Sequence, residues 1–200
     1  MKQYFVTGIG TDIGKTVVSA VLCRRLNAAY YKPIQAGNLE NLESDFIKNL
    51  VPGITIFETK YKLNNPLSPH LAAKLDNVRI DIENITLPNF KESLIVEGAG
   101  GILVPLNDEF TILDLIKKLK LPVIVIVKHY LGSINHSLLT CEVLKQSGVE
   151  IAGIIFNGES NEESEKIILK RTQIPCIGRI PELEKLNQEA IEEASKQLKI

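Results

Sequence analysis

Five short, continuous apolar runs recur along the chain and restrict the folds that it can adopt. They are YFVT (4–7), AYYKPI (29–34), LIVEG (94–98), VIVIV (123–127) and IAGIIFN (151–157). Apolar and polar residues do not alternate within these runs, so both faces of each strand should be covered. This pattern is typical of a parallel β-sheet that is packed between two layers of helices.

Amphipathic stretches occupy the intervals between the runs. Thr111 and Asp114 form a possible capping box at the start of one of them. Helices are expected at 15–27, 111–119, 134–147, 162–170 and 187–198. The alternating order of strands and helices predicts a doubly wound α/β fold, with a mostly parallel sheet and helices on both faces. We expect one domain over residues 1–200, because this length suits one sizeable core.

The middle of the chain has a weaker pattern. Residues 36–92 contain Pro52, Pro66, Pro69 and Pro88 and lack a long apolar run. We interpret this segment as an insertion that packs on the sheet. Helices are expected within it near 42–50 and 69–75.

Composition and charge narrow the class of function. The chain has 23 Lys and Arg residues against 24 Asp and Glu, a formal net charge of -1, so it lacks the basic excess of a nucleic-acid or membrane-surface protein. No apolar run approaches the length of a membrane span, and the N-terminus lacks the apolar region of a signal peptide. Cys23, Cys141 and Cys176 are far apart and match no metal-binding spacing. We therefore expect reduced thiols and a cytoplasmic protein.

The segment GIGTDIGKT (8–16) lies between the first predicted strand and the first predicted helix. A phosphate-binding loop belongs at that place, because backbone N–H groups and a helix N-terminus attract anions there. The usual pattern has four residues between its first glycine and the glycine before the lysine. Five residues separate Gly8 from Gly14, whereas three separate Gly10 from Gly14. The alternative is a glycine-rich turn that binds nothing.

A phosphate loop of this kind predicts partners for its nucleotide. Lys15 should reach the β- and γ-phosphates, and the Thr16 hydroxyl should bind Mg²⁺. Glu97 ends an apolar run and should lie at the carboxyl edge of the sheet, where ligands bind in open α/β folds. The small residues of GAGG (98–101) allow close approach of a ligand. Glu97 is alternatively a surface carboxylate at a strand end.

Two further charged residues are candidates. Lys32 interrupts an apolar run, and a buried lysine needs an anionic partner. It is either a second cation that faces the phosphates or an edge lysine whose head reaches water. Asp45 is a second candidate acid. Without other information, Asp45 is interpreted as a helix cap.

Taken together, these segments resemble the dethiobiotin synthetase family over nearly the whole chain. The family's order is followed by VTGIGTDIGKT (6–16), YKPIQAG (31–37), SD (44–45), PLSPH (66–70), VEGAGG (96–101), LGSINH (131–136) and GRIP (178–181). The first of these looks like the family's long phosphate loop, with its extra residue. The phosphate loop alone is not specific, but the ordered set is. The resemblance implies a fold of the P-loop NTPase type.

The resemblance also implies roles for individual residues. Thr16, Asp45 and Glu97 match the family's Mg²⁺ ligands, and Lys15, Lys32 and Asp12 match its catalytic positions. The positions that match its ATP contacts are Asp12, Ile13, Gly14, Lys15, Thr16, Val17, Asp45, Glu97, Gly98, Ala99, Gly100, Asn157, Pro181, Glu182 and Leu183. The positions that match its substrate contacts are Lys32, Ala36, Gly132, Ser133, Ile134 and Asn135. The last four begin a helix, which Ser133 is expected to cap.

The implied reaction is the ATP-dependent closure of the ureido ring of dethiobiotin from 7,8-diaminononanoate and CO₂, with ATP and Mg²⁺. The implied assembly is a homodimer, in which residues 132–135 bind the carboxylate of the partner's substrate. Two positions depart from the family: Asp12 stands where Glu is usual, and Ala36 lacks the hydroxyl of the usual Ser or Thr. The second departure puts one substrate contact in doubt, not the reaction.

Four other functions share parts of this pattern. A partner-regulated ATPase of the chromosome-partitioning type commonly has a signature lysine where this chain has Gly10. A small GTPase needs a guanine-reading Asn-Lys-x-Asp motif, which is absent. A cobyrinic-acid amide synthetase usually has a glutamine-hydrolysing domain, for which the chain is expected to be too short. A non-enzymatic nucleotide-binding scaffold stays open.

Overall fold

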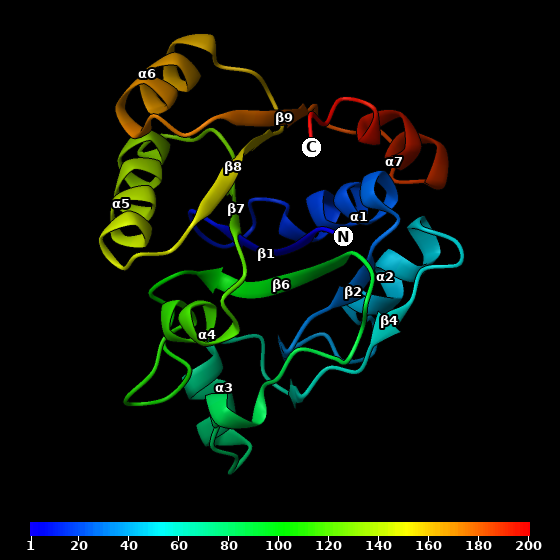
Figure 1. Cartoon of the computed structure of the whole chain (residues 1–200). Helices are drawn as coiled ribbons and strands as arrows, with labels where there is room; N and C mark the ends of the chain where they lie inside the picture. The colour runs from blue at the N-terminus through cyan, green and yellow to red at the C-terminus, as the bar shows by residue number, and fades with distance from the viewer.

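A computed structural model describes residues 1–200 and has a seven-stranded sheet at its centre (Figure 1). The strand order is β4-β2-β6-β1-β7-β8-β9, and every strand pair within it is parallel. The strands are β1 (Gln3–Gly8), β2 (Ala29–Tyr31), β4 (Ile56–Phe57), β6 (Leu94–Gly101), β7 (Val123–Val127), β8 (Ile151–Asn157) and β9 (Cys176–Ile180). The parallel sheet predicted from the apolar runs is confirmed.

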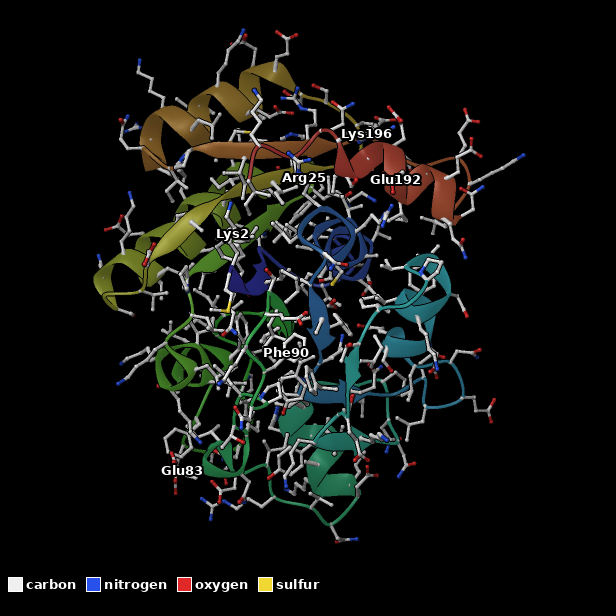
Figure 2. All side chains as sticks on the ribbon, turned by 45° about the vertical axis from the view of Figure 1, so that its right-hand side comes forward. Lys2, Arg25, Glu83, Phe90, Glu192 and Lys196 are labelled. Atoms are coloured by element: carbon white, nitrogen blue, oxygen red, sulfur yellow. The ribbon has the colours of Figure 1, made fainter.

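Helices cover both faces of this sheet, as the doubly wound prediction requires. They are α1 (Lys15–Leu26), α2 (Glu43–Leu50), α3 (Pro69–Leu75), α4 (Ile112–Leu119), α5 (Ser133–Gln146), α6 (Glu162–Thr172) and α7 (Gln188–Ser195). Helices α1, α2 and α7 pack together, and α5 packs with α6 across the sheet from them (Figure 1). Glu192 of α7, which Figure 2 labels, forms an ion pair with Arg24 of α1.

The central strands are buried on both faces, which explains why their sequences are continuous apolar runs. All five residues of β7 are buried, and Phe5 and Val6 of β1 are fully enclosed. These residues belong to one contiguous hydrophobic core that also receives side chains from the helices. Burial of a large aliphatic or aromatic side chain contributes about 1.5–3 kcal/mol, so this core fixes the sheet that carries the site.

The apolar run at 29–34 is not one strand, as the sequence suggested. It divides at Lys32 and Pro33 into β2 and a separate strand, β3 (Ile34–Ala36). Strand β2 pairs with β6, whereas β3 pairs with β5 (Tyr61–Leu63) in a second, two-stranded sheet. Proline has no N–H for a ladder hydrogen bond, so the division falls where pairing is weakest. Lys32 therefore lies at the end of a strand, not within one.

The insertion at 36–92 contains both predicted helices, but their packing differs from the prediction. Helix α2 packs on α1 and α7, and α3 packs on the small sheet β3–β5. The insertion also adds β4 to the edge of the main sheet and one 3₁₀ turn, Ile82–Asn84. Phe57 of β4 meets Phe90 edge to face, with ring centroids 5.2 Å apart. None of the helices is both long enough and apolar enough to cross a membrane.

Candidate active site

The phosphate loop joins β1 to α1 in a conformation that its glycines permit. Gly14 is the N-cap of α1 and has a φ of 82°, in the left-handed region. At Gly8, a Cβ atom would lie 1.9 Å from Cδ1 of Ile13, so a larger residue there would displace the Ile13 side chain beneath the folded loop. Asp12 also has a positive φ, 56°, and its side chain is exposed in the cavity wall.

Asn157, the last residue of strand β8, holds this loop. Its Nδ2 donates a hydrogen bond to the backbone oxygen of Ile13 at 2.8 Å. A Cβ atom at Gly14 would lie 2.2 Å from the same Nδ2. The end of β8 and the phosphate loop are therefore in direct contact, which brings together residues 144 positions apart in the sequence.

Lys15 is almost enclosed by the loop. It is 8% exposed, and its Nζ donates to the backbone oxygen of Gly10 at 3.0 Å. Burial holds the pKa of Lys15 below its ordinary value. Glu97 acts against this shift, while the positive charge of Lys32 adds to it. A cation held in this way is oriented toward the anion site before any phosphate arrives.

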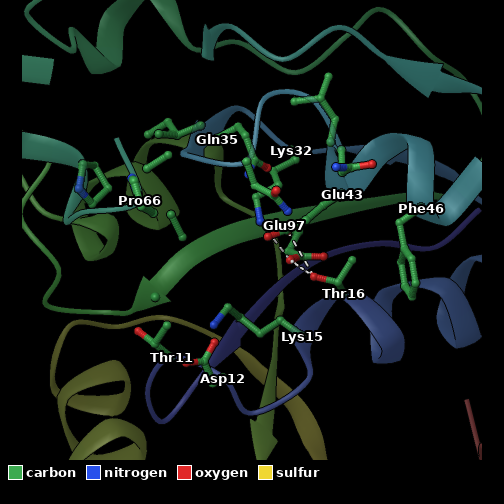
Figure 3. Close-up of a pocket in the computed structure, with 18 of the residues that line it drawn as sticks. Thr11, Asp12, Lys15, Thr16, Lys32, Gln35, Glu43, Phe46, Pro66 and Glu97 are labelled. Atoms are coloured by element: carbon green, nitrogen blue, oxygen red, sulfur yellow. Dashed lines mark hydrogen bonds and ion pairs between the residues drawn. The ribbon is translucent and has the colours of Figure 1, made fainter. Parts of the chain in front are cut away.

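Lys32, Glu97 and Thr16 meet on the other side of the loop (Figure 3). The Nζ of Lys32 and the Oγ1 of Thr16 each lie 3.1 Å from Oε1 of Glu97. The remaining oxygen, Oε2, accepts a hydrogen bond from the hydroxyl of Tyr30 at 3.0 Å. Both oxygens of this buried carboxylate are therefore bonded, which burial of a charge requires. The surface-carboxylate reading of Glu97 and the water-reaching reading of Lys32 are both wrong, since Glu97 is 1% and Lys32 6% exposed.

Charge and hydrogen bonding decide the protonation of Glu97. Burial by itself would raise the pKa of this carboxyl, but the nearby ammonium groups of Lys32 and Lys15 hold it below its ordinary value. Glu97 is consequently an anion at neutral pH. Burial, together with the same negative charge, raises the pKa of Tyr30 well above its ordinary value, so the hydroxyl keeps the proton that it donates to Glu97.

Glu43 is a member of this cluster that the sequence analysis missed. Its Oε2 accepts hydrogen bonds from Lys32 Nζ and, at 3.1 Å, from Thr16 Oγ1. Asp45, the acid expected there, lies two residues further along α2 and is exposed, and its side chain forms no hydrogen bond or ion pair. The sequence signal that could have identified Glu43 is that it is an acidic residue in the first turn of the same helix as Asp45.

A cavity of about 1170 Å³ opens in front of the phosphate loop and the cluster (Figure 3). The residues expected at the site that line it are Asp12, Gly14, Lys15, Thr16, Val17, Lys32, Ala36, Asp45, Glu97, Ala99 and Gly100. Its wall also includes Gln35 and Pro66, which lie in segments that resemble the family, and Phe46, which no pattern singled out. This volume exceeds that of an ordinary small-ligand pocket, so it has room for more than one small molecule.

The other expected residues lie outside the lining of this cavity. Ile13 and Gly98 are behind it, and a Cβ atom at Gly98 would lie 2.7 Å from the Phe5 ring. Pro181 and Glu182 are exposed after β9, and Leu183 is half-buried there.

Residues 132–135 begin helix α5, also outside the lining of this cavity. Gly132 is the N-cap, with a φ of 104°, and no side chain caps the helix. The expectation that Ser133 is the cap is wrong. Ser133 is buried in the first turn, where its backbone oxygen accepts a hydrogen bond from Ser137 at 2.7 Å.

Comparison with solved structures shows the same α/β fold in other proteins. The cell division ATPase MinD of Pyrococcus furiosus matches with a TM-score of 0.57 at 14% identity, over 98% of both chains. A ParA family ATPase from Chlorobium tepidum matches with a TM-score of 0.54 at 14% identity, over 100% of this chain and 92% of that one. The protein family described as AAA domain matches residues 2–190. The chain is a P-loop nucleotide-binding protein of the α/β type.

Sequence relatives define the family within that class. ATP-dependent dethiobiotin synthetase BioD of Christiangramia forsetii is 49% identical over 183 residues, 90% of this chain and 88% of the relative. The protein of the same name in Cytophaga hutchinsonii is 46% identical over 194 residues, 96% of this chain and 94% of the relative. This chain belongs to the ATP-dependent dethiobiotin synthetase family, as its ordered motifs indicated.

Proposed function

We propose that this chain closes the ureido ring of dethiobiotin, using ATP, CO₂ and 7,8-diaminononanoate. The observation that supports this most strongly is the convergence of Lys15, Lys32 and Glu97 on one cavity, beside a glycine-rich loop at a helix N-terminus. Phosphoryl transfer depends mainly on positioning and on neutralising negative charge, and this arrangement supplies both. The family to which the chain belongs supplies the substrate.

The proposed reaction has three steps. One amine of the substrate adds to CO₂ and loses a proton, giving a carbamate. A carbamate oxygen attacks the γ-phosphorus of ATP and releases ADP, which leaves a carbamic-phosphoric anhydride. The second amine attacks the activated carbonyl, expels inorganic phosphate and loses a proton as the ring closes. The last step is intramolecular, which lowers its barrier by about 7–11 kcal/mol at best.

Charged residues of the chain have separate tasks in this scheme. Lys15 stabilises the β- and γ-phosphates, and Lys32 turns toward the phosphoryl group as it is transferred. Asp12 faces the substrate amines from the tip of the loop, where its exposed carboxylate can accept their protons. Asn157 and residues 181–183 contact the adenine. Asn157 ends β8 and residues 181–183 follow β9, so both lie at the carboxyl edge of the sheet, which supports this role.

The donor atoms around Thr16 fit Mg²⁺. The hydroxyl of Thr16 and the carboxylate of Glu97 lie 3.1 Å apart, and oxygen donors of this kind are the ligands that Mg²⁺ prefers. Bound there, Mg²⁺ would neutralise charge on the β- and γ-phosphate oxygens. A carboxylate from α2 completes the set of protein ligands.

The same proposal includes a homodimer with a shared substrate site. The first turn of α5 has free backbone N–H groups that attract a carboxylate, yet it lies outside the lining of this chain's own cavity. A partner chain would therefore use it. Exposed apolar side chains near this turn, Leu131 and Leu139, support burial at an interface. We also propose one domain over residues 1–200 and a cytoplasmic protein, in line with three free thiols.

Product analysis tests the function. ATP, bicarbonate and 7,8-diaminononanoate are incubated with the protein, and phosphate release and the cyclic product are both measured. We expect phosphate release that depends on the diamine and a ring product in equal amount. Phosphate release without the ring product would contradict the proposed function.

A mixture of two inactive variants tests the shared site. Lys15→Ala disables the loop, and Asn135→Asp places a negative charge beside the substrate carboxylate. Asn135 is preferable to Gly132 for this purpose, because a side chain at Gly132 would be strained. After unfolding, equal mixing and refolding, about half of the dimers are mixed and each has one intact site of two, so roughly a quarter of wild-type activity should return. A mixture of refolded dimers as inactive as its parents would exclude the shared site.

A further inference from the structure

Glu165 is a buried carboxylate that the proposed reaction does not use. It lies in α6, and its side chain is only 4% exposed. Its Oε2 pairs with Nη2 of Arg179 in β9, which lies beside α6 (Figure 1). Its Oε1 lies 3.3 Å from Nε2 of His129, just after β7, and accepts a hydrogen bond from the backbone N–H of Asn161 at 3.4 Å. One carboxylate therefore joins three segments that follow or belong to different strands.

Packing alone does not explain a charge at position 165. The buried residues of α6 are Glu165, Ile168 and Thr172, which recur at helical spacing and face the core. An apolar residue at such a position is often as stabilising as a buried ion pair, because removal of charges from water is costly. A carboxylate supplies what an apolar side chain cannot, namely directional bonds that hold separate segments in one arrangement.

One route leads from Glu165 to the end of β8. His129 lies 3.3 Å from the carboxylate, and its ring stacks on Phe156 with centroids 5.5 Å apart and an interplanar angle of 17°. Phe156 directly precedes Asn157, which is proposed to contact the adenine. The carboxylate fixes the ring of His129, and that ring limits the sideways movement of the strand end.

A second route leads from Glu165 to the segment after β9. Arg179 lies in β9, two residues before residues 181–183, which are also proposed to contact the adenine. The backbone N–H of Gly158 donates to the backbone oxygen of Ile180 at 2.9 Å, so the ends of β8 and β9 are joined directly as well. Glu165 thus holds both sides of the proposed adenine site through bonds to other residues, and it lies outside the lining of the cavity itself.

We propose that Glu165 is a positioning residue for the nucleotide base. Its bonds to His129 and Arg179 hold the end of β8 and the segment after β9 at the separation that an adenine ring needs. This inference rests on the proposed function, since it takes Asn157 and residues 181–183 as the adenine contacts. A carboxylate that only stabilises the fold is the alternative that an experiment must separate.

The experiment compares a ligand that has a base with one that has only phosphates. Isothermal titration in the presence of Mg²⁺ gives the Kd of β,γ-methylene-ATP and the Kd of tripolyphosphate. The ratio of the second constant to the first is the nucleoside contribution to affinity, in which effects common to both ligands cancel. The variants are Glu165→Gln, Arg179→Gln and, as a matched loss of charge on the same helix, the exposed Glu163→Gln.

Glu165→Gln keeps the size of the side chain, but an amide has one acceptor oxygen where the carboxylate has two. Either His129 or Arg179 therefore loses its partner. The nucleoside contribution should fall by about tenfold, which one or two misplaced hydrogen bonds to the base account for. The Kd of tripolyphosphate should stay within about threefold of wild type, because the phosphate loop keeps its own contacts. Glu163→Gln should change the nucleoside contribution by less than about threefold.

Arg179→Gln breaks the same ion pair from a side chain that is 46% exposed, so it tests the proposal even if Glu165→Gln does not fold. It should lower the nucleoside contribution in the same direction. Steady-state kinetics give a second readout: the KM for ATP should rise in both variants, while the KM for the diamine should stay within about threefold. Folded variants with an unchanged nucleoside contribution would show a structural carboxylate only and overturn the inference. Equal weakening of both ligands would overturn it as well.

Failure of the proposed function gives a different result. A wild-type chain that binds tripolyphosphate as tightly as β,γ-methylene-ATP has no base site, so the adenine contacts and the inference would both fall. A wild-type chain with a clear nucleoside contribution, which Glu165→Gln and Arg179→Gln both retain, contradicts only the role of Glu165.

Discussion

The ammonium nitrogen of Lys32 lies 3.1 Å from Oε1 of Glu97, and both side chains are almost fully buried. Lys32 follows the short strand β2, and Glu97 lies in β6, with which β2 pairs. Two opposite charges removed from water in this way stabilise each other, but neither is tolerated alone. The ion pair thus couples the stability of the fold to the proposed active site.

Lys32→Met should reveal that coupling. The variant leaves Glu97 with one fewer cation, so the free energy of unfolding should fall by about 2–4 kcal/mol. Glu97→Gln should recover part of this loss in the double variant, with a coupling energy of at least about 1 kcal/mol. Urea unfolding of all four proteins measures it. Additive effects would contradict a direct interaction, and all three variants should be inactive whatever their stability.

Lys15→Ala should separate activity from folding. Removal of a preorganised charge from the transition state should lower kcat by about 10²-fold or more. The side chain bonds only to the backbone oxygen of Gly10, so the far-ultraviolet circular dichroism and the unfolding transition should stay close to wild type. A folded Lys15→Ala variant with near-native turnover would refute the role of this lysine.

Ala36→Thr should have a small effect. Ala36 lines the cavity at the end of β3 and lacks the hydroxyl that is usual in the family. One neutral hydrogen bond contributes about 0.5–1.5 kcal/mol, so the KM for the diamine should change by no more than a few-fold while kcat is retained. Steady-state kinetics with varied diamine measure both constants. Complete loss of binding would mean that the backbone near Ala36 cannot accept the larger side chain.

His129 should make stability depend on pH. Its ring stacks on Phe156, with centroids 5.5 Å apart, and its Nε2 lies 3.3 Å from Glu165, which also pairs with Arg179. Burial, assisted by the positive charge of Arg179, holds the pKa of His129 below its ordinary value. The unfolded chain therefore binds a proton at higher pH than the folded chain does. Stability from this residue is present above about pH 6.5 and is lost as the pH falls toward the lower folded pKa.

His129→Phe isolates this effect, because it retains an aromatic ring against Phe156 and removes the titrating group. Urea midpoints of wild type and variant are compared at pH 7.5 and pH 5.5. The wild-type midpoint should fall more than the variant midpoint over this interval. Equal falls in the two proteins would assign the pH dependence to other groups.

Most of the fold was predictable because its strands are buried on both faces. Between two predicted helices, the run VIVIV can only be a buried strand, and it forms β7 at the residues expected. Strand β9 was not predicted, because CIGRI contains a glycine and an exposed arginine and is too short to show a period. Strand β4 has two residues, and only its neighbour β2 defines it. Such edge elements depend on tertiary pairing that no local pattern encodes.

The positions of site residues were predictable where a sequence motif fixes the backbone conformation. They were less predictable on a helix, because the rotation of the helix about its axis determines which side chain faces the site. Gly14, Lys15 and Thr16 follow from the phosphate loop, and the structure places them at the cavity. Glu43 and Asp45 are both acids in one helical turn, and the sequence does not record the rotation of that turn about its axis. The sequence did not predict the role of Tyr30, because its hydroxyl reaches Glu97 only through the pairing of β2 with β6.

An isotope measurement tests the proposed chemistry most directly. The enzyme is mixed with ATP, 7,8-diaminononanoate and CO₂ labelled with ¹⁸O in both oxygens, and the reaction is stopped before the label exchanges with water. If a carbamate oxygen attacks the γ-phosphorus, each molecule of inorganic phosphate carries one ¹⁸O, and the ureido carbonyl of the product retains the other. Mass spectrometry of both products should show this division. Unlabelled phosphate, or labelled phosphate without the ring product, would contradict the function proposed for this site.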